Sequence, residues 1–135
     1  MNNTLVEKKF ECFEIEIKEK IAHIILNRPE KMNSMPPSFW SDLPEIINEI
    51  DNDALARVIV ISSTGKHFSA GMDLSVFGNA DPSQKKEKSK TDPGRQKASF
   101  YKNLLKLQET FNCIDNSRVP ILMAIHGGCI GGAVD

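Results

Sequence analysis

Two glycine-containing segments carry the residue types and the order that could do chemistry. The first is His67–Leu74 and the second is Gly127–Asp135, and each follows an apolar run of strand length. Glycine leaves backbone N–H groups unshielded and allows conformations that other residues avoid. One N–H group from each segment would form an oxyanion hole, which stabilises negative charge developing on a carbonyl oxygen.

The residues alone leave other interpretations of the second segment open. A glycine-rich turn after a strand is most often only a turn, with no bound ligand. A dinucleotide-binding loop would need the pattern G-x-G-x-x-G, and Cys129 stands where that pattern needs glycine. We therefore set the dinucleotide site aside. Asp135 by itself fits the first turn of a helix, where the helix dipole favours an acid.

The strands that must position these segments are predicted from hydrophobic periodicity. Residues 13–18 alternate apolar and charged side chains, which predicts a strand with one face in water. Residues 21–26 predict a second strand that pairs with the first as a hairpin. The apolar runs at 57–62 and 119–126 predict strands that are buried on both faces.

Two amphipathic helices are predicted by apolar residues three and four positions apart. The first has its apolar face within residues 39–50, with Ser38 as the N-cap. Pro44 lies inside it and would leave the carbonyl of Trp40 without its helical hydrogen bond, so we expect a kink or a late start. The second spans residues 100–114. Strands and helices together indicate an α/β fold.

The composition is that of one globular domain. The chain has 135 residues, a formal net charge of −1 and 40% hydrophobic residues. Residues 79–97 contain almost nothing apolar, so we expect a mobile polar insertion there. The near-neutral charge argues against nucleic acid as a partner. No apolar run reaches the length of a membrane span, so we expect no membrane partner.

The three cysteines are widely spaced, and no histidine lies near them at the spacing of metal ligands. We therefore expect no metal site and a reduced, cytoplasmic protein. Residues 1–20 alternate acids with apolar residues, which argues against a secretory signal and against a transit peptide.

Three motifs carry a resemblance to a known family. They are Leu26–Met35 (LNRPEKMNSM), His67–Leu74 (HFSAGMDL) and Ala124–Asp135 (AIHGGCIGGAVD). In this order they resemble the enoyl-CoA hydratase/isomerase (crotonase) superfamily. Within it, Phe39-Trp40 and Val134-Asp135 are most similar to the dienoyl-CoA isomerases, whereas hydratases usually carry glutamate at the position of Asp135.

The resemblance implies a fold and an activity. The fold is a crotonase-like ββα spiral, of which residues 1–135 would be the N-terminal part of a single domain. The activity is an acyl-CoA isomerase of fatty-acid β-oxidation, which shifts 3,5-dienoyl-CoA to 2,4-dienoyl-CoA through an enolate. No cofactor is expected, because coenzyme A is part of the substrate. Complete enzymes of the family are trimers or pairs of trimers, so we expect a homo-oligomer.

The resemblance also implies roles for residues of the motifs. The backbone N–H groups of Met72 and Gly132 would form the oxyanion hole, and Asp135 would stand at the first acidic position of the site. The residues expected to bind substrate or CoA are Arg28, Lys31, Ala70, Gly71, Met72, Asp73, Leu74, Gly131 and Gly132. For Asp73 the alternative is a structural role, with hydrogen bonds to amides of its own loop.

Two alternatives to the isomerase stay open. The first is an enoyl-CoA hydratase, which adds water to 2-enoyl-CoA. The second is a catalytically incomplete fragment that binds acyl-CoA. A diene shift takes a proton from one carbon and returns one to another. The resemblance places further catalytic carboxylates beyond Asp135, so the chain resembles a truncated enzyme that lacks its second acid/base group.

Overall fold

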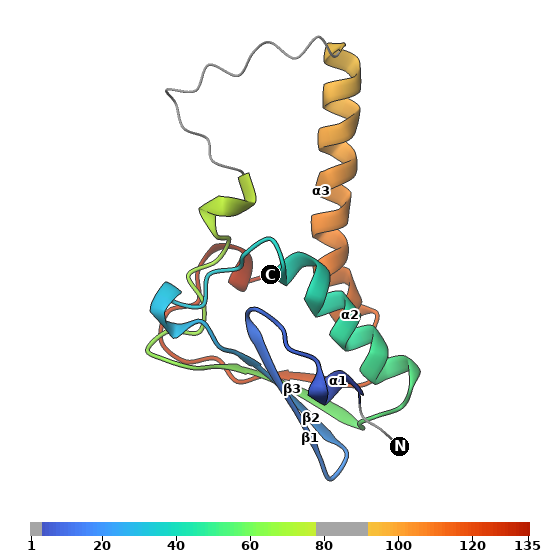
Figure 1. Cartoon of the computed structure of the whole chain (residues 1–135), viewed down its shortest axis with the longest axis vertical. Coiled ribbons are helices and arrows are strands. Elements are labelled where there is room, and N and C mark those ends of the chain that lie inside the picture. The colour runs from blue at the N-terminus through green and yellow to red at the C-terminus, as the bar shows by residue number, and fades with distance from the viewer. Residues whose placement is uncertain (1–3, 78–91) are drawn as a thin grey trace.

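Four strands form one mixed sheet in the computed structural model, which describes residues 4–77 and 92–135 (Figure 1). In their order across the sheet they are β1 (Phe13–Lys18), β2 (Ile21–Leu26), β3 (Val58–Ser63) and β4 (Ile121–Met123). β1 is antiparallel to β2, whereas β2, β3 and β4 run parallel to one another. The carboxyl ends of three strands therefore lie at the same end of the sheet.

The predicted hairpin of β1 and β2 is confirmed, with Lys18 paired with Ile21. Glu19 and Lys20 form the turn, and their φ angles are 51° and 65°. A type I′ turn requires positive φ at both central residues, and its twist matches that of the flanking strands. Along β1 the side chains alternate between core and solvent, as the sequence pattern predicts.

The helix α2 (Phe39–Asn52) connects β2 to β3 and completes a ββα unit with the hairpin. Its buried residues are those on the predicted apolar face: Phe39, Leu43, Ile46, Ile47 and Ile50. They join strand residues such as Ile24 and Ile59 in one core. The helix begins at Phe39, so Pro44 does not delay its start. Ser38 stands at the N-cap position but makes no capping hydrogen bond, because its own backbone is helical, with φ of −63° and ψ of −32°, whereas a capping residue is extended. Its hydroxyl donates to Glu11 instead.

Pro44 lies inside α2 and its ring nitrogen carries no hydrogen, so the carbonyl of Trp40 loses its helical partner. The hydroxyl of Thr110, on the helix α3 (Pro93–Asp115), donates to that carbonyl at 2.9 Å. Thr110 is fully buried. The proline is tolerated because the neighbouring helix supplies the missing donor.

The helix α3 begins earlier than its apolar pattern predicts. Asp92 caps it by accepting a hydrogen bond from the N–H of Arg95, and Pro93 suits the first helical position. Its carboxyl-terminal half packs on α2, whereas its other half projects away from the sheet, where Phe100 is 71% exposed (Figure 1).

The structure describes only part of the segment 79–97, for which a mobile polar insertion is predicted. Residues 79–91 lie outside the described residues. Residues 93–97 form the first turns of α3, which corrects that part of the prediction. The reason is local, because a capping acid followed by proline starts a helix without help from apolar side chains.

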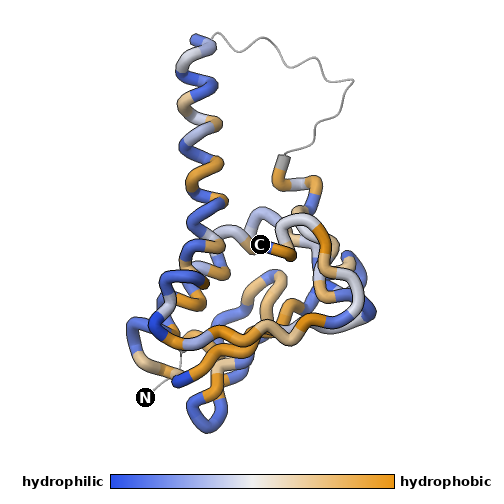
Figure 2. Tube along the Cα trace, turned by 180° about the vertical axis from the view of Figure 1, so that it is seen from behind, coloured by the Kyte–Doolittle hydropathy of each residue, from blue (hydrophilic) through white to orange (hydrophobic). Residues whose placement is uncertain are grey.

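The two parallel strands beyond β2 are less buried than predicted. β3 is fully buried on one face and half-buried on the other. β4 has three residues in place of the predicted 119–126, and Leu122 and Met123 are 58% and 44% exposed. Burial on both faces is therefore a wrong prediction for β4. Ile121 packs half-buried against the core, whereas Leu122, which points to the opposite face, is exposed. Figure 2 shows in orange that the residues along these two strands are mainly hydrophobic.

The described chain also contains short helical turns. They are α1 (Thr4–Glu7), η1 (Pro29–Lys31), η2 (Leu74–Phe77) and η3 (Gly131–Ala133). Within residues 4–77 and 92–135, no helix combines the length and the hydropathy that crossing a membrane requires.

Candidate functional site

The loops that follow β2, β3 and β4 meet at the carboxyl end of the sheet. They contain residues 27–38, 64–73 and 124–130, and so they hold most of the three sequence motifs. In sheets with parallel strands this is the end at which ligands bind. The tertiary structure therefore brings together the two glycine-containing segments that the sequence predicts to act together.

Backbone hydrogen bonds join these loops side by side. The N–H of Met35 donates to the carbonyl of Gly71 at 2.8 Å, and the N–H of Asp73 donates to the carbonyl of Met35 at 2.9 Å. On the other side, the N–H of Ile130 donates to the carbonyl of Ser69 at 3.1 Å. Residues 69–73 thus lie between the other two loops and pair with both.

Asn33 ties the first loop to the second. Its Oδ1 atom accepts from the N–H of Arg28 at 2.8 Å, and its Nδ2 atom donates to the carbonyls of Thr64 and His67 at 2.7 and 3.1 Å. Its own carbonyl accepts from the Ser69 hydroxyl at 2.7 Å. The residue is 2% exposed and has φ of 51°, a conformation that asparagine tolerates better than most residues.

The N–H groups of Met72 and Gly132 have no hydrogen-bond acceptor among the described residues. Both residues line one open cleft of about 690 Å³. Gly71, with φ of 86°, precedes Met72, and Gly131, with φ of 60°, precedes Gly132. In each case a left-handed glycine bends the chain just before the unpaired donor. Two unpaired donors in one cleft can bind a partly negative oxygen.

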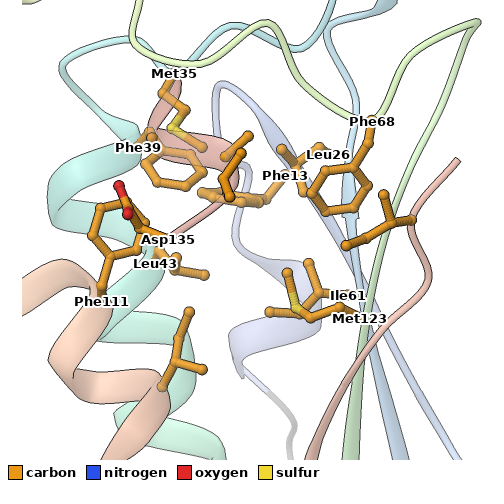
Figure 3. Close-up of a pocket in the computed structure, with 15 residues that line it drawn as sticks. Phe13, Leu26, Met35, Phe39, Leu43, Ile61, Phe68, Phe111, Met123 and Asp135 are labelled. Atoms are coloured by element: carbon orange, nitrogen blue, oxygen red, sulfur yellow. The ribbon is translucent and has the colours of Figure 1, made fainter. Parts of the chain in front are cut away.

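Asp135 lies where the open cleft meets a second, apolar cavity. That cavity has a volume of about 130 Å³ and is lined by side chains of the sheet and of both long helices. Asp135, Gly132 and Phe111 line both hollows. Figure 3 shows the Asp135 carboxylate at the end of the cavity where Phe39 and Phe111 lie. An apolar chain in the cavity would place its polar end beside Gly132.

Arg28 and Asp73 are engaged with each other and with their own loops. The Nη1 atom of Arg28 donates to the carbonyl of Ser34 at 2.9 Å and lies 3.5 Å from Oδ2 of Asp73. Asp73 also accepts from the Ser34 hydroxyl and the Ser75 N–H, both at 3.0 Å. Of these contacts, the bond from the Ser75 N–H is the kind that the structural interpretation of Asp73 predicts, whereas Ser34 and Arg28 belong to another loop. Lys31, in contrast, is exposed on η1.

The remaining predicted binding residues differ in their contacts. The N–H of Ala70 donates to the carbonyl of Met32 at 2.9 Å, which fixes the second loop against the first. Leu74 begins η2 and is 81% exposed. Leu74 therefore presents an apolar side chain to solvent beside the paired loops.

Hydrogen bonds lower the pKa of Asp73, which predicts an acid-dependent loss of stability. The bond from the Ser75 N–H, helped by the Ser34 hydroxyl, lowers the pKa from 3.8 to about 2. The folded chain therefore binds this proton less readily than the unfolded chain does. The stabilisation is present above about pH 4 and is lost as the pH falls towards about 2.

Urea unfolding measured from about pH 5 down to about pH 2.5 checks this prediction. The free energy of unfolding should fall more steeply for the unaltered chain than for Asp73→Asn, which has no proton to gain. Parallel pH profiles for the two proteins would contradict it.

Three side chains near the site have contacts that no sequence pattern indicates. Asn33 belongs to the first motif, but the two carbonyls to which its side chain donates, those of Thr64 and His67, lie more than 30 positions away in the chain. Pro44 predicts an unpaired carbonyl on Trp40 but not the donor, Thr110. Trp40 itself lines the open cleft together with Met72. These contacts depend on the packing of separate elements, so local periodicity carries no signal for them.

The three cysteines are free thiols. Burial raises the pKa of Cys12 to about 12 and that of Cys113 to about 11, so neither is a reactive thiolate near neutral pH. Cys129 is half-buried, and its thiol donates to the carbonyl of Ala133 at 3.1 Å. In the part of the chain that the structure describes, no group of His, Cys, Asp and Glu is placed to hold a metal ion.

Comparison with known proteins identifies the scaffold. A sequence model of the family described as Enoyl-CoA hydratase/isomerase matches residues 16–135. The chain belongs to the enoyl-CoA hydratase/isomerase family. The solved structure of an enoyl-CoA hydratase from Shewanella pealeana superposes on 99% of the chain with a TM-score of 0.75 at 18% identity, and the chain covers 46% of it. The expected crotonase-like α/β fold is therefore confirmed, and the chain corresponds to its N-terminal part.

Curated relatives in this family include dienoyl-CoA isomerases. The mitochondrial Delta(3,5)-Delta(2,4)-dienoyl-CoA isomerase of Homo sapiens is 40% identical over 116 residues, which are 85% of this chain and 34% of that protein. The peroxisomal enzyme of Arabidopsis thaliana is 30% identical over 128 residues, 95% of this chain and 45% of that protein. The chain thus spans between a third and a half of the length of these relatives.

The expected cytoplasmic location conflicts with these relatives and is corrected here. The human protein is mitochondrial and the Arabidopsis thaliana protein is peroxisomal. The prediction rested on unpaired cysteines and on the acids among residues 1–20, and reduced thiols exclude only oxidising compartments. Organelle addresses are short signals read by receptors, so bulk composition does not encode them.

Proposed function

We propose that this chain provides the oxyanion hole of an acyl-CoA isomerase that shifts 3,5-dienoyl-CoA to 2,4-dienoyl-CoA. One observation carries the proposal. The N–H groups of Met72 and Gly132, unpaired among the described residues, share one cleft with Asp135. The dienoyl-CoA isomerases among the relatives favour the diene shift over hydration within the enoyl-CoA hydratase/isomerase family.

In the proposed reaction the carbon next to the thioester loses a proton. The electron pair left behind spreads over the diene and the thioester carbonyl, whose oxygen becomes partly negative. The N–H groups of Met72 and Gly132 would donate to this oxygen, and one such donor contributes about 2.7–4 kcal/mol in other enzymes. A proton then adds at the far end of the conjugated system. The shift involves no net oxidation or reduction, and coenzyme A is part of the substrate, so the proposal includes no cofactor.

The same proposal assigns the other parts of the site. The apolar cavity would hold the acyl chain, and Asp135 at its end would take or return a proton. The second acid/base group would come from outside the residues of this chain. Residues 70–74 and Gly131 would line the thioester and CoA path. The positive charges of Lys31 and Arg28 would face the CoA phosphates.

Turnover of a 3,5-dienoyl-CoA by the full-length gene product, which would supply the second acid/base group, tests this function through the ultraviolet absorbance of the 2,4-dienoyl product. Asp135→Asn keeps the shape of the side chain and removes its ability to accept a proton. We expect it to lower the rate by a factor of about 10²–10⁴ while thioester binding is retained. Asp115→Asn, at an exposed position at the end of α3, is the matched control.

Two results would replace the proposed isomerase function with another function. Consumption of a 2-enoyl-CoA with uptake of water, and no diene shift, would identify an enoyl-CoA hydratase. Calorimetric binding of both thioesters without turnover would identify an acyl-CoA-binding fragment. Absence of both binding and turnover would overturn the assignment of the cleft to acyl-CoA.

We also propose that the protein forms a homo-oligomer, as a trimer or a pair of trimers in the complete enzyme. The exposed apolar residues of the edge strand β4 support self-association of this chain.

A further inference from the structure

The indole of Trp40 forms a wall of the open cleft beside Gly132. We propose that Trp40 determines specificity there by excluding acyl groups that are branched at the carbon next to the thioester, and that Pro44 and Thr110 hold it in place. This inference rests on the proposed function, because it takes the Gly132 N–H as a donor to the thioester oxygen.

The position of the ring is defined by its neighbours in the cleft. Trp40 lines it together with Met72, Gly132 and Asp135. A methyl group placed on Gly132 would lie 3.8 Å from Cη2 of Trp40, which is ordinary van der Waals contact. The six-membered edge of the indole therefore lies against the residue whose N–H would hold the thioester. The carbon next to a thioester bound there would face that edge.

Two aromatic contacts restrict the ring. Its centroid lies 5.5 Å from that of Phe39 at an interplanar angle of 70°, and 5.5 Å from that of Phe111 at 87°. Both are edge-to-face arrangements, which are favourable for aromatic pairs. Because Phe39 belongs to α2 and Phe111 to α3, the indole is held between the two helices. A ring held in this way cannot move aside for a branched ligand without disturbing both contacts.

The backbone of Trp40 is held by a separate device. Pro44 leaves the Trp40 carbonyl unpaired, and the fully buried hydroxyl of Thr110 donates to it at 2.9 Å. This bond joins α2 to α3 at the level of the indole. Leu104, Leu107 and Phe111 line the same cleft from α3, so the bond connects the two helices whose residues line it.

The indole N–H is not used by the protein to hold the ring. Its Nε1 atom is buried and has no acceptor among the described residues. Unpaired buried donors are rare in folded proteins and indicate strain or function. Here the ring is placed by packing and by its backbone bond, with its six-membered edge beside Gly132 in the cleft.

Calorimetric binding of 2-butenoyl-CoA and 2-methyl-2-butenoyl-CoA to the full chain tests the proposal. We expect the unaltered chain to bind the unbranched thioester with an affinity about tenfold higher or more, which is the discrimination that a single carbon group produces in a hydrophobic pocket. Trp40→Leu should reduce this ratio to less than about threefold. Tyr101→Leu removes an aromatic ring from an exposed position of α3 and should leave the ratio of the two affinities unchanged.

A rescue experiment separates positioning from general stability. Thr110→Val removes the donor to the Trp40 carbonyl and should lower the preference. Pro44→Ala in the same chain restores a helical N–H for that carbonyl, so the double variant should recover the preference. Loss of the preference in Thr110→Val without recovery in the double variant would overturn the positioning role of the pair.

The chain has a single tryptophan, so its emission reports on the proposed contact. Binding of the unbranched thioester should change that emission. Binding that is seen by calorimetry with unchanged emission, or an unchanged preference in Trp40→Leu, would overturn this inference alone. Failure of the unaltered chain to bind either thioester would overturn the proposed function together with it.

Discussion

Replacement of Gly71 with alanine should destabilise the chain by about 2–5 kcal/mol and abolish thioester binding. Gly71 has φ of 86°, a conformation that costs an alanine roughly 1–2 kcal/mol. A methyl group there would also lie 2.5 Å from the carbonyl oxygen of Ile130, closer than such atoms can approach. The two segments that carry the Met72 and Gly132 donors would therefore be pushed apart.

Gly132→Ala is the matched control for stability. A methyl group at Gly132 would meet its neighbours at 3.7–3.9 Å, so the free energy of unfolding should change by less than about 1 kcal/mol. Urea unfolding followed by circular dichroism measures both variants. Equal stability of the two alanine variants would contradict the close packing of the two segments around Gly71.

Replacement of Asn33 with alanine should cost about 3 kcal/mol and also loosen the site. The change removes an acceptor for the Arg28 N–H and both hydrogen bonds to the carbonyls of Thr64 and His67. Buried polar groups that lose their partners cost about 1–3 kcal/mol each, although water recovers part of this. Alanine also tolerates the positive φ of this position less well than asparagine.

Asn52→Ala, at an exposed position at the end of α2, should change stability by no more than about 0.5 kcal/mol. Amide hydrogen exchange adds a local readout. In Asn33→Ala the amides of residues 64–73 should exchange faster, because their anchor to the first loop is lost. Unchanged exchange in that loop would show that Asn33 does not hold it.

The sequence by itself determined the elements of this protein and the order of its motifs. Alternation of apolar and charged residues specified the β1–β2 hairpin, and the apolar spacing of residues 39–50 specified the buried face of α2. Both are local properties, because strand and helix periods place side chains on fixed faces. The three motifs likewise indicated the enoyl-CoA hydratase/isomerase family, which the comparison confirms.

Burial of the later strands could not be predicted from residues alone. The apolar run around β4 has the composition of a buried strand, yet Leu122 is 58% exposed. An apolar sequence indicates that a strand is more stable when it is buried. Its actual exposure depends on whether another element packs on it. In this chain β4 lies at the edge of the sheet.

The tertiary structure alone decided how the site is held together. Residues 27–38, 64–73 and 124–130 are distant in sequence, and they meet because β2, β3 and β4 are parallel and end at the same side of the sheet. The carbonyls that accept from the Asn33 side chain lie far along the chain from it. The Thr110 hydroxyl also lies far along the chain from the Trp40 carbonyl that Pro44 leaves without its helical partner. Side-chain periodicity is a local signal, whereas hydrogen bonds between separate elements exist only once the core has fixed the distance between them.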